Sequence, residues 1–170
     1  NPAMVDYFNR IGSYRVRLVT GQSAEEHVID QTRAVSTANE KQMVDELESA
    51  DLIITAVGAG QLPEIAPMLA DGLRGRTRPV NVLAFENMTN AGSYLRQLVA
   101  NNLPHDHSLA KHGFSSVLVS RAVSQQLGDP TSDDLITFIG DPMDTWVVDS
   151  SALCQALPVT QGMLVAENFD

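Results

Sequence analysis

The chain has 170 residues, of which 44% are hydrophobic and 19% charged, and its formal net charge is −10. These proportions are typical of a soluble globular protein and favour one domain with a substantial core. The negative charge argues against nucleic acid or an anionic membrane as the main partner, because phosphate groups would repel the chain.

The first 35 residues predict a helix followed by a hairpin. Apolar residues recur at helical spacing over residues 4–11, and Gly12 ends this helix. Alternation of apolar and polar residues over 14–18 predicts a strand with one face open to water, paired in antiparallel fashion. After a turn at residues 21–23, a second and more polar strand is expected over residues 27–35.

The strongest signal in the chain is an apolar run over residues 52–57, which Asp51 opens and Gly58 closes. A run of this length is typical of a strand buried on both faces, as in a parallel sheet between helices. A small-residue turn and a helical stripe that ends near Gly72 follow it. Before the run, the capping-box spacing of Thr37 and Glu40 predicts the start of another helix.

A second apolar run, over residues 80–85, ends in Glu86 and Asn87 and precedes a helical stripe that Pro104 stops. The two runs and the helix between them predict a βαβ unit with parallel strands. The basic stretch at residues 74–78 is expected to be a solvated surface loop.

The last third predicts short strands at residues 117–119, 135–139 and 146–148, with no long helix between them. This part is expected to be an antiparallel or mixed portion of the sheet, and residues 166–170 could begin a helix. The fold class is therefore α/β, with a mostly parallel sheet.

In an open α/β sheet, ligands bind outside the carboxyl ends of the strands, which places a candidate site at residues 55–60 and at Glu86 and Asn87. A carboxylate and an amide there could bind a sugar hydroxyl or a carboxamide, and the Asn87 amide could donate to a developing oxyanion. An ordinary tight loop without a ligand is the alternative. The four histidines are too scattered to predict a metal site. One cysteine, Cys154, excludes an internal disulfide, and we expect a cytoplasmic protein without membrane spans.

At these motifs the sequence resembles the polyol-specific long-chain dehydrogenases. The likeness is carried by Asp-Leu-Ile-Ile-Thr-Ala-Val-Gly at residues 51–58 and Leu-Ala-Phe-Glu-Asn-Met at residues 83–88, and it continues to Leu157-Pro158. It implies a Rossmann-like fold that binds NAD, in an enzyme that oxidises a polyol or sugar phosphate, as in the conversion of mannitol 1-phosphate to fructose 6-phosphate.

The resemblance also implies roles for individual residues. Asn87 would be catalytic, because it helps to hold the oxygen that is oxidised. Ser120 would face the polyol, although the family usually has an aspartate at this position. The residues implied to contact NAD are Thr55, Ala56, Val57, Gly58 and Glu86.

The family's glycine-rich phosphate loop and its catalytic lysine have no counterpart in this chain, which begins at Asn1. We therefore expect residues 1–170 to be a partial NAD-binding Rossmann domain, without the first βαβ unit and the C-terminal helical catalytic domain, and inactive alone. A non-catalytic nucleotide-binding or interaction module is an alternative that Ser120 favours, and a plain structural domain is a third.

The missing first strand would leave the strand at residues 52–57 with an unpaired edge. Such an edge could pair with a second copy to form a homodimer. Alternatively, a late strand at residues 117–119 or 135–139 could cover it within one chain.

Overall fold

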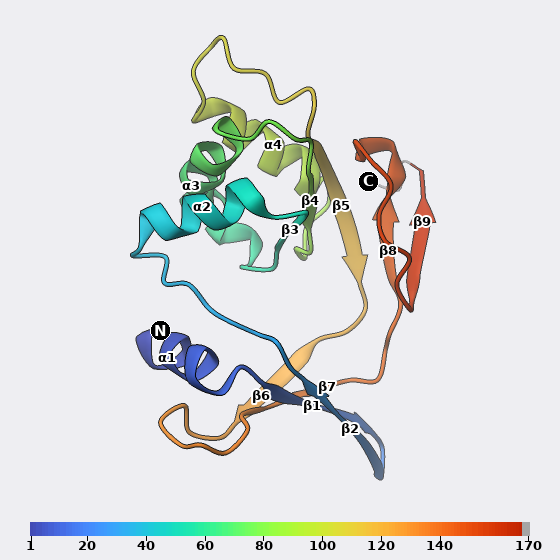
Figure 1. Ribbon diagram of the computed structural model, residues 1–170. Helices are drawn as coiled ribbons and strands as arrows, with labels where there is room; N and C mark the ends of the chain where they lie inside the picture. The colour runs from blue at the N-terminus through green and yellow to red at the C-terminus, as the bar shows by residue number, and fades with distance from the viewer. Residues whose placement is uncertain (168–170) are drawn as a thin grey trace. The chain divides into compact units, whose positions relative to one another are not determined.

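The structure, a computed structural model, describes residues 1–167 and forms two compact units (Figure 1). The first unit contains Asn1–Asn39 and Ser120–Asp144, and the second contains Glu40–Val119 and the residues from Thr145 onward. Each unit is therefore built from two separate stretches of sequence.

The first unit is a four-stranded sheet with one helix. Its order is β2-β1-β7-β6, in which β1 pairs antiparallel with β2 and parallel with β7, and β6 pairs antiparallel with β7. The elements are α1 (Pro2–Ile11), β1 (Tyr14–Thr20), β2 (Ser23–Ile29), β6 (Val123–Leu127) and β7 (Thr137–Gly140).

The predicted helix and hairpin of the first unit are confirmed. Gly12 ends α1 with a φ of 68°, a conformation that glycine adopts without strain. The predicted bounds of the second strand, residues 27–35, were wrong: β2 begins at Ser23, directly after a tight turn, and ends at Ile29. Its side chains are exposed on both faces, so no apolar pattern marked its start.

Tyr7 connects α1 to the sheet of the first unit. Its ring is fully buried, and its hydroxyl donates to the carbonyl oxygen of Ser13 at 2.9 Å and accepts from the backbone N–H of Ile136 at 2.9 Å. The hydroxyl thus satisfies two backbone groups while the ring fills the core, as buried tyrosines generally do.

The second unit is a five-stranded sheet in the order β3-β4-β5-β8-β9. The pairs β3–β4, β4–β5 and β8–β9 are parallel, and β5–β8 is antiparallel, so the predicted α/β class with a mixed portion is confirmed. The elements are α2 (Glu40–Ser49), β3 (Leu52–Thr55), the 3₁₀ turn η1 (Ala59–Gln61), α3 (Leu62–Arg74), β4 (Asn81–Ala84), α4 (Ala91–Asn101), β5 (Gly113–Val119), β8 (Trp146–Asp149), the 3₁₀ turn η2 (Ser150–Ala152) and β9 (Met163–Ala166).

Three expected boundaries differ. Helix α2 begins at Glu40, so Thr37 does not cap it, and α3 continues through Gly72 to Arg74. Ala166 ends strand β9, so it does not begin the helix expected over residues 166–170, and residues 168–170 lie outside the described part of the chain.

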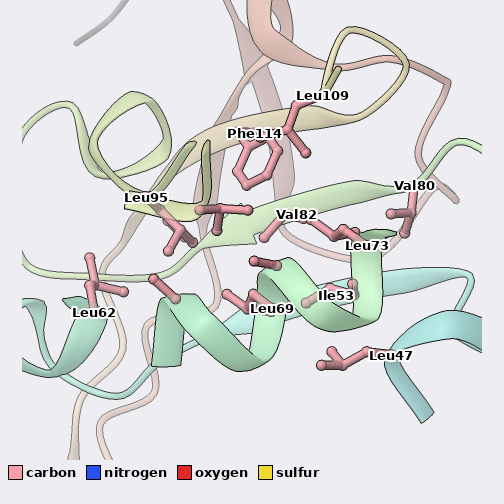
Figure 2. Packing of buried hydrophobic residues seen from close by; sticks show 14 of the residues in the cluster. Leu47, Ile53, Leu62, Leu69, Leu73, Val80, Val82, Leu95, Leu109 and Phe114 are labelled. Carbon is pink, nitrogen blue, oxygen red and sulfur yellow. The ribbon is translucent and has the colours of Figure 1, made fainter. Parts of the chain in front are cut away.

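The main core lies where α2, α3 and α4 cover one face of the sheet (Figure 1). Figure 2 shows Leu69 and Leu73 close to Ile53 and Val82 on the strands, and Leu47 belongs to the same cluster. On the opposite face Leu83, Val117 and Val148 form a smaller buried cluster. Alternate residues of β4 thus enter different clusters, which explains why Val82, Leu83 and Ala84 are all apolar.

Strand β3 departs from the expectation of burial on both faces. It ends at Thr55, and Ile54 is 53% exposed while Ile53 and Thr55 are buried. No strand among residues 1–167 pairs with the outer edge of β3, because β5 pairs with β4 and β8 while β7 belongs to the first unit. The alternative that a late strand covers this edge was therefore wrong.

The basic stretch at residues 74–78 is not simply solvated. Arg76 is only 5% exposed, and its guanidinium donates to the backbone carbonyls of Leu47, Glu48 and Ala50 at 2.5, 2.9 and 2.8 Å. The last carbonyls of a helix have no partner within the helix, and this side chain supplies one at the end of α2. The expectation of a surface loop was wrong for this residue.

Candidate functional site

The carboxyl ends of β3 and β4 lie side by side. The two strands are parallel neighbours, with Leu52 opposite Asn81 and Thr55 opposite Ala84. One further hydrogen bond, from the N–H of Phe85 to the carbonyl of Thr55 at 2.8 Å, continues the pairing beyond the strands. This confirms the predicted adjacency of the strands and brings residues 55–58 next to residues 85–87.

Glu86 connects these two strand ends. Its Oε1 accepts from the backbone N–H of Val57 at 3.1 Å, and its Oε2 accepts from the N–H of Gly58 at 2.8 Å. Glu86 is only 6% exposed, and its own carbonyl accepts from the N–H of Met88 at 2.8 Å. Hydrogen bonds to an ionised carboxylate are strong, so Glu86 holds the turn after β3 in a fixed shape.

Gly58 makes this turn possible. It has a φ of 90°, and its N–H faces the Glu86 carboxylate while its carbonyl accepts from Gln61 at 2.8 Å. A side chain at this φ would be strained. Gly58 itself is the feature of the sequence that predicted a turn here. The hydrogen bond from its N–H to Glu86, which follows the neighbouring strand, could not be predicted from the glycine.

The surface of this edge combines apolar side chains with one open amide. Val57 is 43% exposed, Met88 is 37% exposed, and Ala56 is also exposed. Asn87 is exposed, and its side-chain amide makes no hydrogen bond to any residue from 1 to 167. The edge can therefore contact a flat ring and still donate a hydrogen bond to a polar atom beside it.

Thr55, the last residue of β3, is buried next to these exposed residues in sequence. It is 4% exposed, and its Oγ1 has no hydrogen-bond partner in the described part of the chain. Buried hydroxyls nearly always have a partner, so an unpartnered one at a strand end is consistent with a ligand or water nearby.

The N-terminus of α4 reaches the same edge through residues that sequence reasoning missed. The N–H of Gly92 donates to the Ser116 hydroxyl on β5 at 3.0 Å. A Cβ on Gly92 would lie only 2.6 Å from the backbone of Ser115 and Ser116, so the helix rests directly on the strand. No periodic pattern marks such a contact, although a glycine in the first turn of a helix is a weak signal for one.

Ser120 is exposed, follows β5 directly and belongs to the first unit, whereas the residues described above belong to the second. Val57 and Gly58 are hydrogen-bonded to Glu86 in the second unit; Thr55 and Ala56 precede this pair in sequence, and Asn87 follows Glu86.

No group of three or more His, Cys, Asp or Glu side chains within residues 1–167 could hold a metal ion. None of the helices in this range combines the length and apolar character needed to cross a bilayer.

A mostly parallel α/β sheet with its candidate site at the carboxyl ends of two parallel strands is typical of a Rossmann-type domain, the class that binds nucleotide cofactors. Residues 1–162 match the family model of the mannitol dehydrogenase Rossmann domain, and the chain belongs to this family. The resemblance identified from the strand-end motifs is thereby confirmed.

Similar proteins carry the name mannitol-1-phosphate 5-dehydrogenase. The protein of this name from Shouchella clausii strain KSM-K16 is 35% identical over 159 residues, which cover 90% of this chain and 41% of that protein. The one from Brevibacillus brevis is 33% identical over 176 residues, covering 99% of this chain and 44% of that protein, and the one from Anoxybacillus flavithermus strain DSM 21510 / WK1 is 29% identical over 164 residues. The chain thus spans less than half the length of these relatives.

Proposed function

We propose that this chain is the cofactor-binding part of an NAD-dependent dehydrogenase that oxidises mannitol 1-phosphate to fructose 6-phosphate. The observation that carries the proposal is the carboxyl edge of β3 and β4, where Glu86 fixes the turn at Val57 and Gly58 and leaves the Asn87 amide open. The relatives' names supply the reaction, and the family supplies the Rossmann domain.

The residues at this edge fit the nicotinamide and ribose end of NAD. The exposed side chains of Ala56 and Val57 would contact the ring or ribose, and the buried hydroxyl of Thr55, which has no partner within residues 1–167, lies at the end of the strand that precedes them. NAD would accept the hydride that leaves the polyol carbon. Asn87 would donate a hydrogen bond to the substrate oxygen as that oxygen changes charge during oxidation.

We extend the proposal to the organisation of the whole protein. Residues 1–170 would form a partial NAD-binding Rossmann domain, completed by a phosphate-binding βαβ unit and a helical catalytic domain outside this chain. Ser120 would face the substrate, a small polyol or sugar phosphate. The protein would work in the cytoplasm and not on nucleic acid, an expectation that the net charge of −10 supports.

The experiment is an assay of the purified full-length protein for reduction of NAD in the presence of mannitol 1-phosphate. Unphosphorylated mannitol and NADP are the comparison substrate and cofactor. The proposal predicts clear turnover with mannitol 1-phosphate and NAD. Binding of NAD without turnover of any polyol or polyol phosphate would contradict it.

That contrary result would favour a second function, a nucleotide-binding module without catalysis. Ser120 is the observation in its favour, since the resemblance described above implies an aspartate at this position. The variant Ser120→Asp separates the two functions. If the serine alone accounts for a lack of turnover in the wild-type protein, the aspartate should restore turnover; if other catalytic groups are also missing, it should not.

A further inference from the structure

The turn between β3 and α3 contains two neighbouring backbone N–H groups, those of Val57 and Gly58. Successive N–H groups in a glycine turn form a concavity that binds anions such as phosphate. Here both groups already donate to one carboxylate, with Oε1 and Oε2 of Glu86 at 3.1 and 2.8 Å. We propose that Glu86 fills the anion site of this turn from within, so that the turn accepts an uncharged part of the dinucleotide and excludes phosphate.

Burial makes this internal anion difficult to displace. Glu86 is 6% exposed, and no cationic side chain within residues 1–167 forms an ion pair with it. Its negative charge is therefore balanced chiefly by the two N–H groups. A phosphate that approached the same groups would meet a like charge and would have to expel a buried carboxylate, and both effects are unfavourable.

The outward surface of the turn agrees with this exclusion. It includes the exposed side chains of Ala56 and Val57, and the neighbouring strand end adds Met88. Apolar contacts of this kind suit a flat ring and its sugar better than a charged group. Glu86 is thus a positioning residue, which selects the ring and ribose end of the cofactor and also fixes the backbone that carries Asn87.

This inference rests on the proposed function for the identity of the dinucleotide, but its test needs neither cofactor nor substrate. The full-length protein is labelled with ¹⁵N on valine and glycine, and the amide signals of Val57 and Gly58 are followed by NMR while inorganic phosphate is added. In the wild-type protein, phosphate should leave both signals in place.

In Glu86→Ala the two N–H groups lose their partner, and added phosphate should shift both signals in a saturable way. Glu86→Gln retains one acceptor oxygen without the charge, so it should show the same shifts more weakly, and it serves if the alanine variant does not fold. The matched control is Glu64→Ala, which removes an exposed carboxylate from the first turn of α3 and leaves the bonds from Val57 and Gly58 to Glu86 in place, so it should behave as wild type.

Saturable phosphate shifts at Val57 and Gly58 in the wild-type protein would overturn the inference. So would folded Glu86→Ala and Glu86→Gln variants whose two signals do not respond to phosphate. Loss of the proposed function, seen as no NAD turnover in the assay above, would leave this NMR result unaffected, so the two failures are distinguishable.

Discussion

At the level of single residues, Arg76 illustrates how one side chain can hold a loop against a helix. Three arginines stand at positions 74, 76 and 78, but only Arg76 is buried, and its burial lowers the pKa of the guanidinium from its usual value. The N–H groups of its guanidinium donate hydrogen bonds to three backbone carbonyls at the end of α2. Those carbonyls would lie without protein partners if the side chain were removed.

Arg76→Ala should therefore destabilise the protein by about 2–4 kcal/mol, because charged hydrogen bonds are lost and buried acceptors remain. Urea unfolding followed by circular dichroism measures the change. Arg78→Ala is the matched control, since Arg78 makes only an exposed ion pair with Asp51 at 3.7 Å. It should alter the free energy of unfolding by less than about 1 kcal/mol, and equal effects of the two variants would contradict the assignment.

His112 gives the fold a specific pH dependence. It is 2% exposed, its Nδ1 accepts from the N–H of Val80 at 3.3 Å, and its Nε2 has no partner in residues 1–167. Burial, together with the positive charges of Lys111 and Arg76, lowers the pKa of His112 from 6.5 to about 4. The folded state is therefore more stable with the His112 ring neutral than with the ring protonated.

Since the folded pKa lies below the unfolded one, the unfolded chain binds this proton first as the pH falls. The wild-type protein should lose stability between pH 6.5 and about 4 through this residue, by at most roughly 3 kcal/mol, and lose no more through it below that range. Urea unfolding of His112→Asn at several pH values should show a shallower loss over the same window. His105→Asn, at an exposed position, should keep the wild-type slope; an equal slope in the His112 variant would refute the prediction.

At the level of elements, the close approach of α4 to β5 shapes the candidate site. The N-terminus of α4 follows the loop that carries Asn87, and Gly92 lets it contact the strand. In Gly92→Ala the new Cβ would meet backbone atoms of β5 at 2.6–2.7 Å, and these cannot rotate away.

Gly92→Ala should therefore move α4 and cost about 2 kcal/mol of stability or more. Hydrogen exchange should report faster opening of the α4 amides. Gly60→Ala is the control, because a Cβ there meets nothing within 4 Å and its φ is not positive. It should change stability by less than about 1 kcal/mol. Similar destabilisation by both alanines would mean that the close contact is not the cause.

Apolar periodicity predicted the elements that pack on a core. The runs at residues 52–57 and 80–85 and the helical stripes after them became β3, α3, β4 and α4. Strand β6 was missed because all its side chains are exposed and its pairing with β7 alone defines it. Strand β9 is a short apolar run whose pairing with β8 could not be predicted locally.

The site was predictable to a similar degree. Strand polarity placed residues 55–58 beside Glu86 and Asn87, since parallel neighbours end at the same edge. The bonds from Glu86 to Val57 and Gly58 depend on how one side chain turns back toward the next strand, which no sequence spacing specifies. The burial of Arg76 was missed for the same reason.

At the level of the whole molecule, β3 is the outermost strand of its sheet, and no strand of residues 1–167 pairs with its lateral edge. The side chain of Ile54 on this strand is exposed. The isolated 170-residue chain is expected to form a homodimer through this edge, because its free N–H and C=O groups can pair with a second copy. Light scattering at increasing protein concentration measures the mass.

Ile54→Lys should weaken that dimer, since symmetric pairing would bring two like charges close together. Val159→Lys places the same charge at a site that is 96% exposed and should leave the mass unchanged. A monomer at every concentration, with β3 amides protected from hydrogen exchange, would rule the dimer out.

The most direct measurement of whether the β3–β4 edge takes part in catalysis is the steady-state kinetics of Asn87→Ala in the full-length protein. If the Asn87 amide stabilises charge on the substrate oxygen, kcat for mannitol 1-phosphate should fall on the order of a hundredfold while KM for NAD changes little. Asn102→Ala, which removes an exposed amide at the far end of α4, should retain wild-type kinetics. A wild-type kcat in Asn87→Ala would contradict the catalytic assignment of this edge.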